Sequence, residues 1–143
     1  MTISGFILDP AFAATSFRLG DLTLSEARLQ EDARYPWIVL IPRLPGLREV
    51  EDLDAARRAA LMDEAVAAGA AARAIGAVLN LAVEKLNIGA LGNVTPQLHL
   101  HVVGRRISDP AWPGPVWGHS AAAPYGSDLR DAAIGAARAA LGL

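Results

Sequence analysis

The sequence predicts an α+β domain, in which an antiparallel sheet of about five strands packs with one long helix and a short C-terminal helix. Short apolar runs separated by turn residues indicate hairpins, and an alanine-rich tract between them indicates a helix. The 143 residues, 52% of them hydrophobic, suffice for one core. We therefore expect one domain over residues 1–143, with its core at about 15–107 and a Pro- and Trp-rich tail and final helix at 108–143.

The first half of the chain predicts three strands and the long helix. The expected strands are 17–19, 22–29 and 37–41. Gly20-Asp21 is typical of a two-residue hairpin turn between the first two. The third is an apolar run that Pro42 ends, as in a strand buried on both faces. Acidic residues at 49–54 favour the N-terminal end of a helix, which we expect to run to about Val83.

The second half predicts another hairpin, an irregular tail and a final helix. The expected strands are 85–90 and 97–103, with a turn at Gly92-Asn93. Four prolines exclude regular structure from 108 to 125, and Ser127 is expected to cap a helix that ends near Leu141. For Trp112 and Trp117 three roles stay open: covering a pocket, closing a dimer interface, or packing in the core.

Residues 97–103 carry the chemistry, because polar and apolar side chains alternate there. On a strand, Gln97, His99 and His101 would share one face. The intervening residues would anchor the other face in the core; they are Leu98, Leu100 and Val102. Neighbouring imidazoles supply a nucleophilic nitrogen and hydrogen-bond donors near neutral pH, which suits work on an anionic group.

Composition excludes several classes of function. A net charge of −2 argues against binding to a nucleic-acid polymer. The absence of cysteine excludes disulfides and thiolate chemistry and is compatible with a reducing cytoplasm. The start of the chain lacks the basic region of a targeting peptide. Residues 59–83 are apolar but contain Asp63, Glu64 and Arg73, so we expect no membrane span.

Residues 87–103 resemble the signature of the histidine triad (HIT) superfamily, His-φ-His-φ-His-φ-φ with φ apolar, except that Gln97 replaces the first histidine. Residues 32–43 resemble the family's segment in which Asp or Asn precedes a strand ending in proline. Residues 109–118 resemble a tail of a bacterial HIT-like branch. The resemblance covers about 15–120, and it implies the predicted fold and a homodimer paired through sheet and helix.

The resemblance also implies roles for single residues. His99 would attack the α-phosphorus of a nucleotide and carry a nucleotidyl intermediate that water hydrolyses, and His101 would hydrogen-bond the phosphate. Asp32 would bind the ribose hydroxyls, and Asn87 and Asn93 would lie near the scissile phosphate. The residues also have simpler explanations, since Asp32 could cap a turn and asparagine favours turns beside glycine. The family chemistry requires neither a cofactor nor a metal.

Gln97 leaves the function open, because glutamine can hydrogen-bond but cannot exchange protons near neutral pH. The main expectation is a nucleotide phosphohydrolase or nucleotidyl transferase, similar to diadenosine polyphosphate hydrolases, that cleaves a nucleoside monophosphate from a linked group. A nucleotide-binding module without turnover is the first alternative. The second is a metal-dependent hydrolase, in which zinc on the two histidines would need a further ligand such as His119, Asp109 or Glu84.

Overall fold

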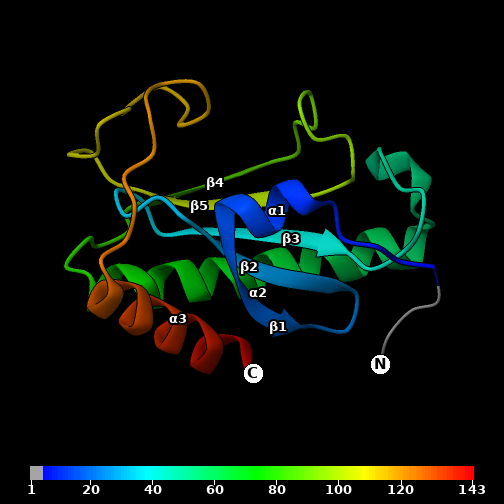
Figure 1. Cartoon of the computed structure of the whole chain (residues 1–143), viewed down its shortest axis with the longest axis horizontal. Coiled ribbons are helices and arrows are strands. Elements are labelled where there is room, and N and C mark those ends of the chain that lie inside the picture. Colours follow the sequence, from blue (N-terminus) through cyan, green and yellow to red (C-terminus); the bar gives the residue numbers. More distant parts are fainter. Residues whose placement is uncertain (1–4) are drawn as a thin grey trace.

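The computed structural model describes residues 5–143 and contains the expected five-stranded antiparallel sheet (Figure 1). The strands are β1 (Ser16–Asp21), β2 (Ser25–Gln30), β3 (Trp37–Pro42), β4 (Lys85–Gly89) and β5 (Leu100–Arg105). Their order across the sheet is β1-β2-β3-β5-β4, and every neighbouring pair is antiparallel. The expected domain and the targeting-peptide expectation both include residues 1–4, which lie outside the described residues.

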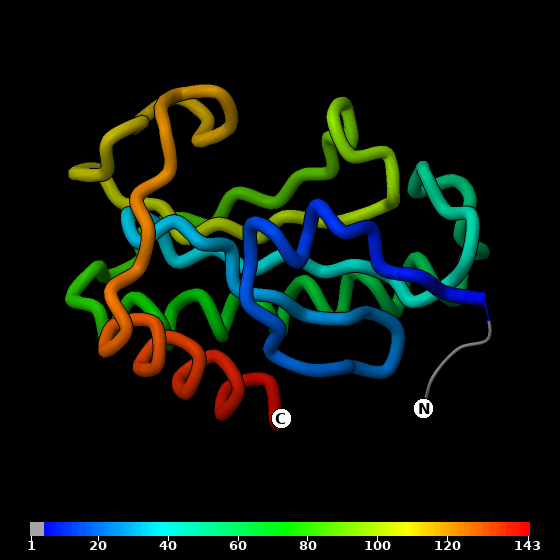
Figure 2. Tube along the Cα trace, viewed as in Figure 1, coloured from blue at the N-terminus to red at the C-terminus, as the bar shows by residue number. Residues whose placement is uncertain are grey.

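Helices and loops cover the two faces of the sheet differently. The helices are α1 (Pro10–Thr15), α2 (Ala55–Val78) and α3 (Ser127–Leu141), with a 3-10 turn η1 (Val50–Asp52) before α2. One core joins α2 and α3 to the sheet. A second, smaller cluster on the other face joins α1 to the tail after β5, which arches over the sheet before it reaches α3 (Figures 1 and 2).

The long helix ends five residues earlier than the sequence predicts. It begins as expected, since the Asp54 side chain accepts a hydrogen bond from the Arg57 amide. Asn80 has a left-handed φ of 57°, and the Leu81 amide bonds the Gly76 carbonyl at 2.7 Å. This is a left-handed helix end that satisfies a terminal carbonyl. The predicted end at Val83 is therefore wrong.

Local turn chemistry also differs from the prediction at both ends of the chain. Gly20 and Asp21 are not a turn: they continue β1, and the connection to β2 lies at 22–24. Helix α1 was not predicted, although Asp9 followed by Pro10 is a helix-start signal. Ser127 is the first residue of α3 and Gly126 precedes it as the N-cap, so Ser127 does not cap the helix.

The tail from 108 to 125 contains neither helix nor strand, as its prolines predict. Within residues 5–143, the helices are too short or too polar for any of them to span a bilayer.

Candidate active site

The two histidines lie together where the chain enters β5. Their ring centroids are 4.8 Å apart, and His99 and His101 are 7% and 9% exposed. The strand begins at Leu100 rather than at residue 97 and runs to Arg105. The apolar residues between and beside the histidines face the helix-covered core as predicted; they are Leu98, Leu100 and Val102.

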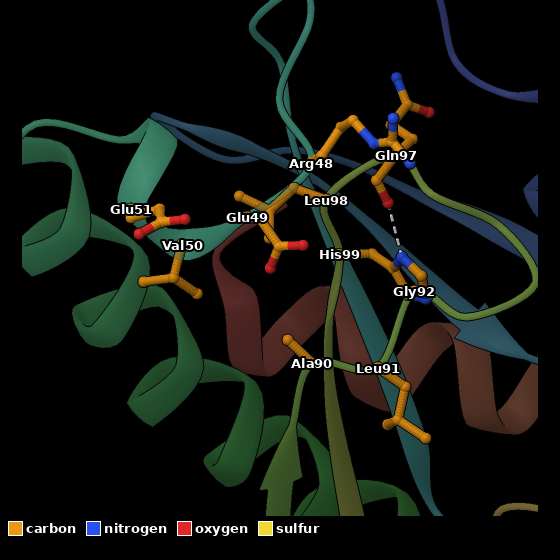
Figure 3. A pocket seen from close by; sticks show the side chains of 10 residues that line it. All are labelled: Arg48, Glu49, Val50, Glu51, Ala90, Leu91, Gly92, Gln97, Leu98 and His99. Carbon is orange, nitrogen blue, oxygen red and sulfur yellow. Dashed lines mark hydrogen bonds between the residues drawn. The ribbon is translucent and has the colours of Figure 1, made fainter.

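A backbone hydrogen bond fixes the tautomer of His99. Its Nδ1 lies 2.7 Å from the carbonyl oxygen of Gln97, drawn as the dashed line in Figure 3. A carbonyl oxygen only accepts, so Nδ1 must donate its proton. In the neutral ring the lone pair is then on Nε2. His99 therefore presents a nucleophilic nitrogen on the side away from the backbone.

Trp37 fixes the opposite tautomer in His101. The indole Nε1 of Trp37 lies 3.0 Å from His101 Nδ1, and an indole N–H only donates. Nδ1 is therefore an acceptor, and the proton of the neutral ring is on Nε2. Burial, with a smaller contribution from His99, lowers the pKa of His101 from 6.5 to about 3. His101 is thus a neutral hydrogen-bond donor at physiological pH.

Two cavities meet at this histidine pair. One, of about 280 Å³, lies beneath α1 and is lined by Ala11, Phe12, Thr15, Gln30, Val39, Val94, Thr95, His99 and His101. The other, of about 410 Å³, is lined by Leu91, Gly92, Asn93, Val94, Thr95, His99, His101, Trp117 and Gly118. Both cavities share the two imidazoles. A molecule with a central anionic group could extend from the histidines into each.

A third cavity, of about 380 Å³, opens beside His99 toward the loop after β3 (Figure 3). Charged side chains distinguish its lining from that of the other two: Arg48, Glu49 and Glu51. The Gln97 side-chain amide points away from the His99 ring in this view.

The structure brings only part of the predicted site together. Asn93 lines the larger of the two shared cavities. Asn87 instead accepts a hydrogen bond from Arg105 Nη1 at 2.7 Å and lines none of the three cavities around the histidines. Gln97 and His99 both precede β5 and line the third cavity together, but the Gln97 side-chain amide bonds the backbone of Ile7 and Asp9.

Asp32 is buried outside the linings of the three cavities around the histidines. It is 2% exposed, and both carboxylate oxygens accept hydrogen bonds from the Arg34 guanidinium at 2.9 Å. The hydrogen bond to Asp32 raises the pKa of Arg34, and burial opposes that increase only in part. Asp32 lines none of the three cavities. It holds a turn together, which was the simpler of its two explanations.

The zinc alternative lacks its ligand set. Across residues 5–143, no three His, Cys, Asp or Glu side chains gather as a metal site requires. The proposed third ligands are engaged elsewhere: Asp109 pairs with Arg105, Glu84 accepts from the Ile107 amide, and the exposed His119 contacts Ser120.

The tail is held over the site by a buried ion pair. Arg105 and Asp109, with side chains 1% and 0% exposed, bond at 2.8 Å, and Arg105 also donates to the Gly114 carbonyl. Burial alone would raise the pKa of Asp109, but hydrogen bonds from Arg105 and nearby amides hold that pKa below its ordinary value. The ordered tail places the Trp117 ring 5.4 Å from His101. Trp117 thus lines the pocket and also packs against the second core cluster, which are two of the three roles left open.

Three contributors to the site escaped the sequence prediction: Phe12, Gln30 and Trp37. The Phe12 ring packs edge-on against His99 at 4.8 Å, and the Asp-Pro helix signal could have placed it. Gln30 lines the cavity beneath α1. Trp37 was assigned to a buried strand, but its bond to His101 depends on the pairing of β3 with β5, which no local pattern shows.

Comparison with known proteins identifies the class. The HIT domain family matches residues 12–108, more than half of the chain. The protein belongs to the histidine triad family. Its paired imidazoles and its five-stranded sheet agree with this membership. Membership in this family points to nucleotide binding and to hydrolase or transferase activity. No curated protein matches the chain.

Three solved histidine triad proteins are similar over nearly the whole chain. That from Sinorhizobium meliloti 1021 is 36% identical, covering 92% of this chain and 94% of its own, with a TM-score of 0.85. The Bradyrhizobium japonicum protein is 37% identical, with coverages of 96% and 98% and a TM-score of 0.85. The protein from Marinobacter aquaeolei VT8 is 34% identical, with coverages of 97% and 98% and a TM-score of 0.86.

Proposed function

We propose that this protein transfers a nucleoside monophosphate from a linked group to His99 and then to water. The observation that carries the proposal is the pair of opposite tautomers: an Nε2 lone pair on His99 and an Nε2–H donor on His101. Nucleophilic substitution at phosphorus needs one of each, a nucleophile and a donor aimed at the developing negative charge.

The two shared cavities support a substrate with a phosphate between two larger groups. Phe12 and Val39 give the cavity beneath α1 apolar surface for a base, and Gln30 adds a polar side chain. The second cavity, with Asn93 and Trp117, would accept the leaving group. The phosphate would then lie at the histidines, where the two cavities meet.

The proposed reaction has two steps, transfer to His99 and then transfer to water. His99 Nε2 bonds to phosphorus as the bond to the leaving group breaks, and the leaving group departs with that electron pair and takes a proton from solvent. Water then attacks phosphorus and loses a proton to solvent, the N–P bond returns its electrons to Nε2, and the nucleoside monophosphate is released. The Gln97 carbonyl at Nδ1 stabilises the positive charge that the ring carries in the intermediate.

The resemblance to the family implies a homodimer, and we extend the proposal to it. Exposed apolar residues support it, with Met62 54% and Val66 69% exposed on α2 and Ile88 44% exposed on the edge strand β4. Light scattering coupled to size exclusion measures the mass directly. We propose the cytoplasm as the location. Nucleotides are abundant there, and a chain without cysteine is compatible with its reducing conditions.

The test is incubation of metal-free protein with AMP- and GMP-linked substrates, including diadenosine polyphosphates and phosphoramidates, followed by mass spectrometry. We expect release of the monophosphate and a nucleotidyl adduct on His99. His99→Ala should lower the turnover rate at least about a thousandfold while AMP still binds. Nucleotide binding without release or adduct would favour the binding module instead, and unchanged turnover in His99→Ala would refute the assignment.

A further inference from the structure

Gln97 has the position of a triad histidine, but its side chain is bound to another part of the chain. Its Oε1 accepts from the Asp9 amide at 2.8 Å, and its Nε2 donates to the Ile7 carbonyl at 2.9 Å. In Figure 2 the blue N-terminal segment passes the loop that leads into β5, where these contacts form. The amide thus pairs with backbone groups about ninety positions earlier in the chain.

We infer that Gln97 is a positioning residue that ties the N-terminal segment down as a wall of the nucleoside cavity. The inference rests on the proposed function for the identity of that cavity. It differs from the expectation that Gln97 shares a face with the two histidines and works with them on an anionic group.

The tether connects directly to the cavity through α1. Asp9, held by Gln97, is the N-cap of α1, and its side chain bonds the Ala11 amide at 2.9 Å. One turn further, Phe12 packs against the His99 ring and lines the cavity with Ala11 and Thr15. A six-residue helix is too short to be stable alone. Its position therefore depends on such attachments.

The two functions of residue 97 are separable, because they use different atoms. The backbone carbonyl orients His99, whereas the side-chain amide holds the N-terminal segment. Replacing the side chain leaves the carbonyl in place. The nucleophile should thus keep its tautomer when the tether is cut, and the loss should appear in binding of the nucleoside rather than in the chemical step.

The experiment compares Gln97→Ala and Gln97→Glu with Ile7→Ala. Glutamate keeps the shape of glutamine but turns the donor that bonds Ile7 into an acceptor. Ile7 contributes only its backbone carbonyl to the contact with Gln97, and the residue is 82% exposed. Ile7→Ala keeps that carbonyl and is therefore the matched control. The readouts are the Kd for AMP, the rate constant of adduct formation at saturating substrate, and hydrogen exchange of the Asp9 amide.

In Gln97→Ala we expect the Kd for AMP to rise about tenfold, as the loss of two hydrogen bonds implies. Gln97→Glu keeps the acceptor for the Asp9 amide and loses only the bond to Ile7, so its Kd should rise less. The rate constant of adduct formation should change less than about twofold. In Gln97→Ala the Asp9 amide should exchange at least about tenfold faster, with the β5 amides unchanged, whereas Gln97→Glu should keep much of the protection of the Asp9 amide. Ile7→Ala should match the wild type in all three.

Two results would overturn the inference. One is unchanged exchange of the Asp9 amide in Gln97→Ala, which would show that no tether exists. The other is Gln97→His raising the rate constant of adduct formation with exchange at Asp9 as in the wild type, which would place residue 97 at the reaction. The exchange readout needs no nucleotide. Failure of the tether is thus distinguishable from failure of the proposed function, which would show as absence of AMP binding and of any adduct in the wild type.

Discussion

The two faces of the β3–β5 pair are both buried but are built from side chains of different chemistry. On the helix side, the packed residues are aliphatic: Ile38, Leu40, Leu100 and Val102. On the other side, Trp37 and Val39 lie beside His99 and His101, under Phe12 and Trp117. The first face requires only that apolar side chains fill the space. The second face also requires that its buried nitrogen atoms form hydrogen bonds with defined partners. Changes to the first face should alter stability alone, whereas changes to the second can alter both stability and chemistry.

The largest effect is expected where the second face depends on a buried charge. Arg105→Met leaves Asp109 buried without its cation, which should lower the free energy of unfolding by about 3–5 kcal/mol. Urea unfolding measures this loss. In Arg105→Met/Asp109→Asn the uncharged amide can still accept from the Ala111 and Trp112 amides, so stability should partly recover. An equal loss in the double variant would contradict the buried-charge explanation.

A cavity in the helix-side face should cost stability but spare the chemistry. Leu40 is fully buried in the larger core, and Leu40→Ala should lower the free energy of unfolding by about 3 kcal/mol. The rate constant of adduct formation, measured well below the unfolding temperature, should stay within about twofold of the wild type. A large drop in that rate constant without unfolding would show that the two faces are not independent.

Acid should destabilise the protein through the second face. The pKa of His101 is about 3 when folded and 6.5 when unfolded, so below pH 6.5 the unfolded chain takes up a proton that the folded protein excludes. This contribution is fully present above pH 6.5 and should be reduced by about 2 kcal/mol at pH 5. Urea unfolding of wild type and His101→Gln across this range checks it. Parallel pH profiles would exclude His101 as the cause.

The smallest effect tests the tautomer of His101. Trp37→Phe keeps an aromatic ring but removes the N–H that bonds Nδ1, and the rate constant of adduct formation should fall about tenfold. Trp117→Phe is the matched control: Trp117 also packs on His101, but its Nε1 bonds no atom within residues 5–143. Similar rate losses in both variants would mean that ring packing, not the hydrogen bond, matters.

The sequence predicts the helix-side face better than the site. Alternation at 97–103 correctly placed Leu98, Leu100 and Val102 in the core, because burial of apolar side chains is a local pattern with a fixed period. The prediction of residues 17–41 found three strands, but it set the first turn at Gly20-Asp21, where a register shift lets β1 continue. Turn positions depend on pairing with the neighbouring strand.

Of the predicted site, the structure brings together the central histidine pair and Asn93, which lines the larger shared cavity. His99 and His101 are two residues apart where the chain enters β5, and their rings lie side by side. The partners that set their tautomers and surroundings come from distant segments, as with Trp37 and Phe12. Asp32 and Asn87 were assigned by resemblance, and each is engaged by an arginine instead. Resemblance transfers a motif but does not show which polar groups a particular chain uses to hold its own loops.

The wall and the cover of the histidine pair belong to the same chain as the histidines: α1 supplies one, and the tail with Trp117 supplies the other. One folded chain therefore lines both cavities beside the histidines. If the proposed transfer uses only these groups, the rate per chain should not depend on protein concentration.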